Sequence, residues 1–207
     1  MSNPFPSSIA AIDFFDNPSP IDLSGNGGPV INSARGNIAF TAINPLNSAV
    51  AGWFQFPNAM PSANINTLLF CGTIDSSFST NNSVWVYVFS GKTAITSITY
   101  RSGGTVLTFS IASTNFSTWQ HVAFNNTGGS VQGYLNGVSI GTLGTIVNPD
   151  IRAIGINTEG SLRGNVHGAG VGVWDRVLTS GELAWLADAD NRPGPSSGGF
   201  PLSRLVN

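Results

Sequence analysis

The sequence predicts an all-β domain, an antiparallel two-sheet jelly-roll sandwich with one short helix near its C-terminal end. Short β-prone runs follow one another at intervals of about 10 to 14 residues, and clusters of Gly, Pro, Asn and Ser separate them. A single late segment carries the signals of a helix start. With 207 residues, of which 41% are hydrophobic, the chain is long enough to bury a core without disulfides.

The strand pattern accounts for most of the chain. The run at 83–89, SVWVYVF, is apolar at successive positions, which is typical of a strand in the middle of a sheet. The run at 104–112 is rich in β-formers but alternates less clearly. The expected strands cover residues 8–15, 37–42, 49–56, 67–72, 83–89, 93–100, 104–112, 118–125, 130–136, 138–142, 151–156 and 165–174.

Two local motifs predict finer structure in the second half of the chain. Asn136 and Gly137 stand between two β-prone runs, and because both accept a positive φ angle they predict a hairpin with a type I′ turn. Thr179 and Glu182 match a capping box, in which Thr179 caps a helix and Glu182 reaches back to its amide. The apolar stripe that follows predicts a helix ending near Asp190.

One core and no internal repeat indicate a single domain with two extensions. We expect an N-terminal arm at residues 1–20, the jelly-roll domain at 21–189 and an extended tail at 190–207. The arm is rich in Pro, and the tail is rich in Pro, Gly and Ser. Free chain ends usually fray unless something holds them, so we expect these ends to pack on the domain or on a neighbouring chain.

Composition excludes several functional classes. Charged residues make up 9% of the chain, against roughly 25% in an average domain, and 62 residues are Asn, Ser or Thr. This neutral, polar surface is usual in extracellular or particle-borne β proteins. A net charge of −2 and a single lysine, Lys92, argue against nucleic-acid binding. No apolar run approaches the ~18 residues of a membrane span, and the first residues do not read as a signal peptide.

Several motifs, in the same order along the chain, resemble those of the concanavalin A-like, laminin-G-like jelly-roll domains. The resemblance extends from about residue 12 to residue 186. Its carriers are DLSGNGG at 22–28 (the loop after the first strand), AVAGWF at 49–54 (an aromatic strand), WQHVAF at 119–124, YLNG at 134–137 followed by IG at 154–155, and VWDRVLTSGEL at 173–183 (the closing strand and short helix).

The resemblance implies a binding domain, because such domains mostly bind glycans, proteins and sometimes calcium. Some relatives are glycosidases, which need two carboxylates about 5 to 10 Å apart. The only glutamates here are Glu159, in an expected loop, and Glu182, in the expected helix cap. The late strand, which often carries an acidic pair in the family, reads VHGAGV at 166–171. We therefore expect no enzymatic activity, and we expect His121 to be a packed structural residue.

Four residues are candidates for ligand contact. Asp22 is the one calcium ligand that the resemblance supplies, but without the late acidic pair we expect it to bond its own loop amides and expect no cofactor. Trp85 and Tyr87 share one face of their strand and form the candidate sugar platform, with a place in the core as the alternative. His167 lies among small residues, where it could line a shallow groove.

These observations lead to two functional hypotheses. The first is a non-enzymatic structural or adhesive protein on a particle surface, such as a bacteriophage virion decoration or fibre component made in the host cytoplasm. It would contact other virion or capsid proteins, or itself, through residues 1–20 and 190–207, and would touch glycans. The second is a soluble extracellular lectin that binds carbohydrate. An exposed patch containing Trp85, Tyr87 or His167 would favour the lectin.

Overall fold

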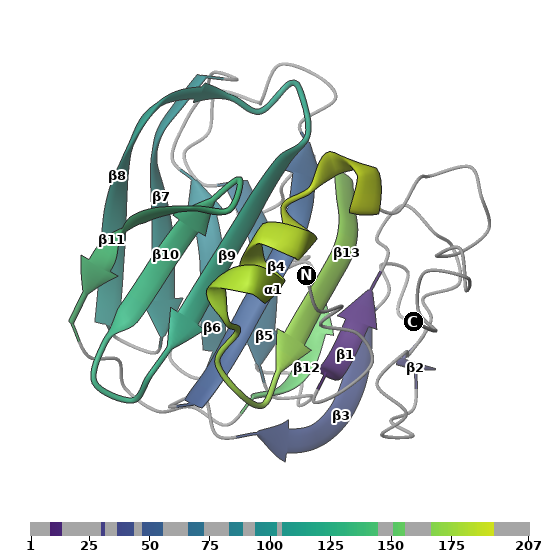
Figure 1. The fold of residues 1–207 in the computed structure, drawn as a ribbon. Coiled ribbons are helices and arrows are strands. Elements are labelled where there is room, and N and C mark those ends of the chain that lie inside the picture. Colours follow the sequence, from purple (N-terminus) through teal and green to yellow (C-terminus); the bar gives the residue numbers. More distant parts are fainter. Residues whose placement is uncertain are drawn as a thin grey trace.

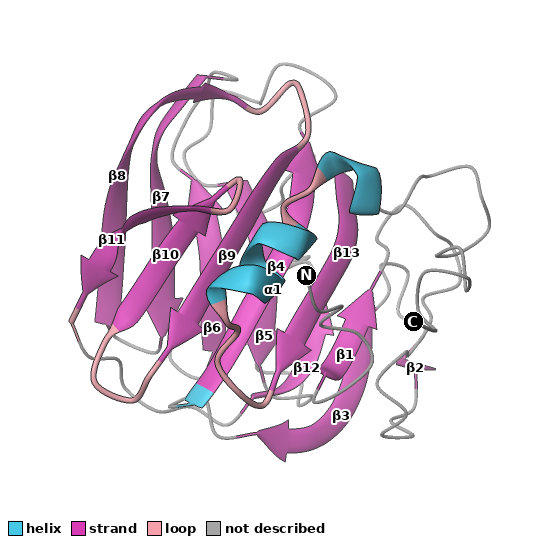
Figure 2. Ribbon diagram, in the orientation of Figure 1, coloured by secondary structure: helices cyan, strands magenta, loops and turns pink. Residues whose placement is uncertain are grey.

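The protein is a sandwich of two antiparallel β-sheets with one short helix on its outer surface (Figure 1; Figure 2). This architecture confirms the predicted fold class. The computed structural model describes residues 9–13, 30–31, 37–43, 47–55, 66–72, 83–88, 94–102, 105–144, 151–155 and 167–192.

The first sheet contains six strands, and it lies in front of the second in the view of Figure 1. Each strand is antiparallel to its neighbours. In spatial order the strands are β1 (Ile9–Asp13), β13 (His167–Trp174), β4 (Ser48–Gln55), β9 (Gln120–Asn126), β10 (Val131–Leu135) and β11 (Val138–Leu143).

The second sheet contains seven strands and is also antiparallel throughout. Strand β6 has a neighbour on each side, which confirms that residues 83–89 supply a central strand; the two-residue β2 was not predicted. In spatial order the strands are β2 (Val30–Ile31), β3 (Asn37–Ile43), β12 (Ile151–Gly155), β5 (Asn66–Gly72), β6 (Ser83–Val88), β7 (Ala94–Ser102) and β8 (Thr105–Asn115).

Aromatic side chains join the two sheets across the core. Tyr100 of β7 and Phe109 of β8 both contact Phe124 of β9, with ring centroids 5.0 and 5.2 Å apart. All three side chains are buried. Because side chains alternate between the two faces of a strand, these contacts identify which positions of β7 and β8 point inward and which point outward.

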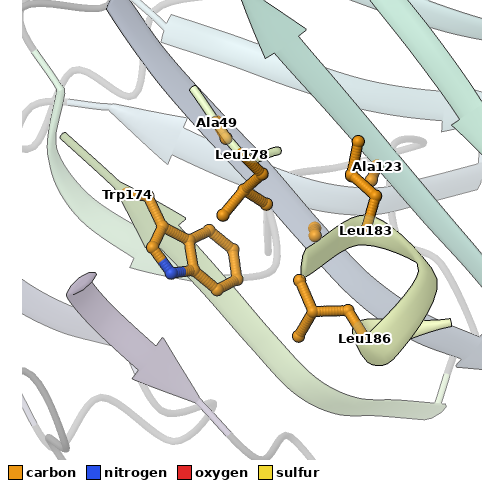
Figure 3. Close-up of a cluster of buried hydrophobic side chains, with 7 residues drawn as sticks. Ala49, Ala123, Trp174, Leu178, Leu183 and Leu186 are labelled. Atoms are coloured by element: carbon orange, nitrogen blue, oxygen red, sulfur yellow. The ribbon is translucent and has the colours of Figure 1, made fainter. Parts of the chain in front are cut away.

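Helix α1 (Ser180–Leu186) covers the outer face of the six-stranded sheet. In Figure 1 it lies in front of β4 and β9. Small side chains of the sheet, Ala49 and Ala123, let Leu183 and Leu186 of the helix approach closely, and Figure 3 shows these residues around the same cluster. The Nε1–H group of Trp53 donates a hydrogen bond of 2.9 Å to the carbonyl oxygen of Leu186, which ties β4 to the helix end.

The helix begins as predicted and ends earlier than predicted. The Thr179 side chain accepts from the Glu182 amide, and the Glu182 carboxylate accepts from the Thr179 amide, so the capping box is confirmed. The helix ends at Leu186 rather than near Asp190. Asp188 accepts a hydrogen bond from the Asp190 amide and starts a separate 3-10 turn, η4 (Ala189–Asn191). This competing local bond explains the early end.

The predicted hairpin between β10 and β11 is also confirmed. Asn136 and Gly137 have φ angles of 50° and 79°, as a type I′ turn requires. The Asn136 side chain accepts from the amide of His121 on β9 and donates to Gln120, which fixes the turn against the neighbouring strand. A side chain on Gly137 would lie 3.2 Å from Cβ of Ala187, so the turn also packs on the helix end.

Parts of both expected extensions belong to the sandwich. Residues 9–13 form edge strand β1, which pairs with β13. At the other end, Asp190 and Asn191 belong to η4, and Arg192 packs on the rings of Trp53 and Trp119. The remaining residues of the arm and tail lie outside the described residues, and so does Asp22.

Candidate functional site

The two outer faces of the sandwich differ in what covers them. Helix α1 packs on the outer face of the six-stranded sheet, where it buries Ala49, Ala51 and Ala123 of strands β4 and β9. Among the described helices and strands, none lies over the outer face of the seven-stranded sheet. That face is therefore the candidate binding surface.

The predicted platform residues lie in the middle of this sheet. Trp85 and Tyr87 belong to β6 and alternate with Val86, which is buried and pairs with the core residue Tyr100. Their positions therefore belong to the outer face. Cross-strand pairing places Trp85 opposite Arg101 of β7.

The pairing of β6, β7 and β8 forms two rows of residues on this face. One row runs from Trp85 through Arg101 to Val106, and the next from Tyr87 through Thr99 to Thr108. We call these six positions the outer β6–β8 face. On β8, Val106 is 49% exposed and Thr108 is exposed, whereas Arg101 is half-buried and Thr99 is buried.

A hydroxyl pair lies within the second row. The Oγ1 atoms of Thr99 and Thr108 are 3.3 Å apart, and either can donate. The hydrogen bond orients the exposed hydroxyl of Thr108. Ser110, two residues further along β8, is also exposed and lies opposite Ser97 of β7. Strand β8 therefore presents these two exposed hydroxyl side chains, and strand β7 separates them from the aromatic positions of β6.

The structure separates His167 from the other predicted site residues. His167 is the first residue of β13 in the six-stranded sheet, where it pairs with Gln55 of β4. Trp85 and Tyr87 lie in the opposite sheet. A single site on one sheet face therefore cannot contain all three positions.

His121 is a structural residue, as the sequence suggested. Its side chain is 1% exposed and packs edge-on against Trp53, with ring centroids 5.3 Å apart. Desolvation by burial lowers the pKa of His121 from 6.5 to about 3, so the ring is neutral at ordinary pH. Its Nδ1 atom has no hydrogen-bond partner among the described residues. A proton on the ring would thus be strongly disfavoured.

Glu182 is fully engaged in holding the helix start. Its carboxylate accepts hydrogen bonds from Arg176, at 2.9 and 2.6 Å, and from the amide and hydroxyl of Thr179. The Arg176 hydrogen bonds are the main reason that the pKa of Glu182 falls from 4.5 to about 2, with the Thr179 bonds adding to them against the opposing effect of burial. A carboxylate held in this way is unsuited to proton transfer at neutral pH.

Metal-binding and membrane-spanning features can be assessed for the described part of the chain. Within it, no three His, Cys, Asp or Glu side chains gather closely enough to hold a metal ion together. No helix there has the length and apolar character needed to cross a bilayer.

One cluster near α1 was not anticipated from the sequence. The guanidinium of Arg192 lies between two indole rings, 5.6 Å from the centroid of Trp53 and 5.2 Å from that of Trp119. These cation–π contacts hold the chain after η4 against β4 and against the turn before β9. Only folding brings the three residues together, because Trp53 and Arg192 are far apart in sequence.

Comparison with known proteins gives structural relatives only. No protein-family model matches the chain, and no curated protein sequence matches it. The binding domain of botulinum neurotoxin serotype D superposes with a TM-score of 0.65 at 13% identity, covering 88% of this chain and 51% of that one. The chain thus spans about half the length of this toxin domain.

Two further structures show the same fold. Domain 4 of an extracellular GH43 arabinanase from Geobacillus stearothermophilus, solved with arabinotriose, gives a TM-score of 0.55 at 18% identity and covers 87% of this chain and 98% of that domain. A Trypanosoma rangeli sialidase solved with sialic acid gives 0.60 at 13% identity, covering 89% of this chain and 33% of that one. At these identities the likeness establishes a shared β-sandwich fold.

Proposed function

We propose that this protein is a non-catalytic, lectin-like domain that binds saccharides on the outer β6–β8 face. The observation that carries the proposal is the contrast between the two outer faces. The helix occupies one, while the other presents Val106 and Thr108 of β8 to solvent, in the same cross-strand rows as Trp85 and Tyr87 of β6. The resemblance to laminin-G-like domains favours the same kind of activity.

The chemistry of this face suits a sugar ring. Sugars present apolar C–H faces and a rim of hydroxyl groups, and aromatic side chains with neighbouring hydroxyls complement both. Thr108 and Ser110 are exposed and uncharged, so they can donate to or accept from sugar hydroxyls. The structural relatives solved with arabinotriose and sialic acid support a saccharide ligand.

A non-enzymatic role fits the carboxylates of the described residues. Retaining and inverting glycosidases need a pair of carboxyl groups, one of which changes its protonation state. Glu182 instead forms a two-pronged ion pair with Arg176. It belongs to the helix that packs on the six-stranded sheet, whereas the proposed face belongs to the other sheet. Within the described strands of the seven-stranded sheet there is no Asp or Glu at all.

Glycan-array screening followed by calorimetric titration with the best saccharide tests the proposal. We expect Trp85→Ala and Tyr87→Ala each to weaken binding roughly ten-fold or more, because each removes a stacking surface of the proposed site. His167→Ala is the matched control, since it alters a candidate residue on the other sheet. Equal loss in the His167 variant, or no saccharide binding by the intact protein, would contradict the proposal.

The particle-surface hypothesis adds a location to this binding role. In this second proposal the domain is carried on a virion, as a decoration or fibre component, and touches host glycans. The low charge content and the 62 Asn, Ser and Thr residues favour an external setting. It requires contacts to neighbouring subunits from segments outside the sandwich, so its test is self-association of the full chain.

A further inference from the structure

The described strands of the seven-stranded sheet carry charged side chains of only one sign. Its described strands contain two arginines, Arg101 and Arg152, and no carboxylate. The chain as a whole carries a net charge of −2, whereas the charged side chains on the described strands of this sheet are all positive. The strands therefore contribute a local positive charge where the proposed binding face lies.

Arg101 occupies the middle of that face. It follows the buried Tyr100 on β7, so its position points away from the core. Its cross-strand neighbours are Trp85 on one side and the 49% exposed Val106 on the other. The side chain is itself half-buried. A cation set between apolar neighbours is less screened by water than one on an open surface, which strengthens its interaction with an anion.

Arg101 has the geometry for a carboxylate. A guanidinium presents five N–H donors in a planar fork that matches the two oxygens of a carboxylate. Arg101 has an interaction within the protein, and with five N–H donors a guanidinium can hold more than one partner. In the adjacent row, the buried Thr99 hydroxyl lies 3.3 Å from the hydroxyl of the exposed Thr108, and the Thr108 side chain is the one that a sugar hydroxyl could reach.

We propose that the outer β6–β8 face selects acidic saccharides, those that carry a carboxylate, and that Arg101 is the residue that recognises this group. The inference rests on the proposed saccharide binding and specifies its ligand class. Arg101 would bind the carboxylate, the β6 positions would stack on the ring, and Thr108 would bond a ring hydroxyl. A neutral sugar of the same shape would lose only the charge-assisted contact.

Matched pairs of saccharides test this selectivity. The probes are 3′-sialyllactose and trigalacturonic acid, each compared with its own methyl ester, which has nearly the same shape but no charge. We expect the intact protein to bind the acid of at least one pair roughly ten-fold more tightly than the ester, and the preference to shrink as salt rises. Equal binding of acid and ester in both pairs would overturn the inference.

Variants of Arg101 assign the preference to this residue. Arg101→Gln should abolish the acid-over-ester preference, because glutamine removes the charge that distinguishes the acid from its ester. Arg101→Lys should retain a reduced preference, since a lysine keeps the charge and loses the two-pronged geometry. A preference that survives in Arg101→Gln would refute the assignment, provided the variant melts at the same temperature as the parent.

The same titrations separate failure of this inference from failure of the proposed function. If the protein binds acid and ester equally and Trp85→Ala weakens both, the saccharide site stands and selection by Arg101 is wrong. If it binds none of the four probes and no glycan on an array, the proposed function fails, and the inference fails with it.

Discussion

At the scale of single residues, burial determines which side chains can do chemistry. His121 and Glu182 have side chains of the types that most often carry out acid–base catalysis. Both are committed to the structure instead, one by desolvation and the other by an ion pair. The residues proposed for binding are ordinary in their chemistry and are distinguished by position.

His121 should make the protein sensitive to mild acid. Its pKa is about 3 when folded and near 6.5 when unfolded, so the unfolded chain takes up a proton first. The contribution of His121 to the free energy of unfolding is therefore full above pH 6.5 and falls as the pH drops towards 3. We expect the free energy of unfolding, measured with urea, to decrease by about 2 kcal/mol between pH 7.5 and 5 on this account.

Substitution isolates this contribution. His121→Gln removes the titrating group, so whatever its own stability, its pH dependence from 7.5 to 5 should be nearly flat. His167→Gln measures the share of the other histidine separately, so that the slope lost in His121→Gln can be assigned to His121. Glu182 contributes little to this slope, because its stabilising effect begins to fall only below its unfolded pKa of 4.5. A parent protein with no slope in this range would show that His121 is accessible to protons when folded.

Glu182 should lose its contribution only in stronger acid. Its folded pKa, about 2, lies below the unfolded value of 4.5, so it stabilises the fold above pH 4.5 and this is lost as the pH falls towards 2. At pH 7, Glu182→Gln should lower the free energy of unfolding by about 1–3 kcal/mol, through the weakened cap and the unpaired Arg176. Urea titration at pH 7 and at pH 3 checks this, since the difference between parent and variant should shrink at the lower pH.

At the scale of elements, close packing explains why particular strands carry glycine. A Cβ atom on Gly172 of β13 would lie 2.7 Å from the ring of Trp174, which is fully buried. The indole has no room to withdraw. We expect Gly172→Ala to destabilise the protein by about 1–3 kcal/mol through overpacking.

A second glycine provides the control for that substitution. A Cβ atom on Gly129, in the turn between β9 and β10, would have no neighbour within 4 Å. Gly129→Ala should therefore change stability by less than about 1 kcal/mol. Thermal unfolding of both variants by calorimetry would measure the difference, and equal melting temperatures would mean that β13 can shift to accommodate the new methyl group.

At the scale of the whole molecule, the sandwich and its extensions can be tested separately. Because residues 9–13 form β1 and Arg192 packs on Trp53 and Trp119, a trimmed protein should retain residues 9–192. The particle-surface proposal predicts that the full chain self-associates in light scattering and that the trimmed protein is a monomer. Cutting instead at residues 20 and 190 would remove an edge strand and the Arg192 contact, and should lower the melting temperature.

The two outcomes of the light-scattering measurement distinguish the particle-surface proposal from a soluble lectin. Self-association that disappears on trimming supports assembly through residues 1–8 or 193–207. A monomer at both lengths would count against the particle-surface proposal and favour a soluble lectin. Saccharide binding by the trimmed protein should be unchanged in either case, because the outer β6–β8 face lies within the sandwich.

Local patterns in the sequence determined where the strands and turns lie. Apolar runs, the Asn136-Gly137 pair and the Thr179–Glu182 capping box depend on residues close together in the chain, whose conformational preferences act over a few positions. Strand β2 leaves no recognisable pattern in the sequence, because only two of its residues pair. The helix ends before the predicted position, because Asp188 caps a separate 3-10 turn.

Only the tertiary structure decided which surfaces remain available and which charges face them. The sequence could pair Trp85 with Tyr87, but it could not show that α1 covers the opposite sheet, that His167 lies on that sheet, or that Arg101 pairs with Trp85. It also gave no sign of the contacts that Arg192 makes with two distant rings. Burial and electrostatic environment arise from contacts between residues far apart in the chain, which local preferences do not encode.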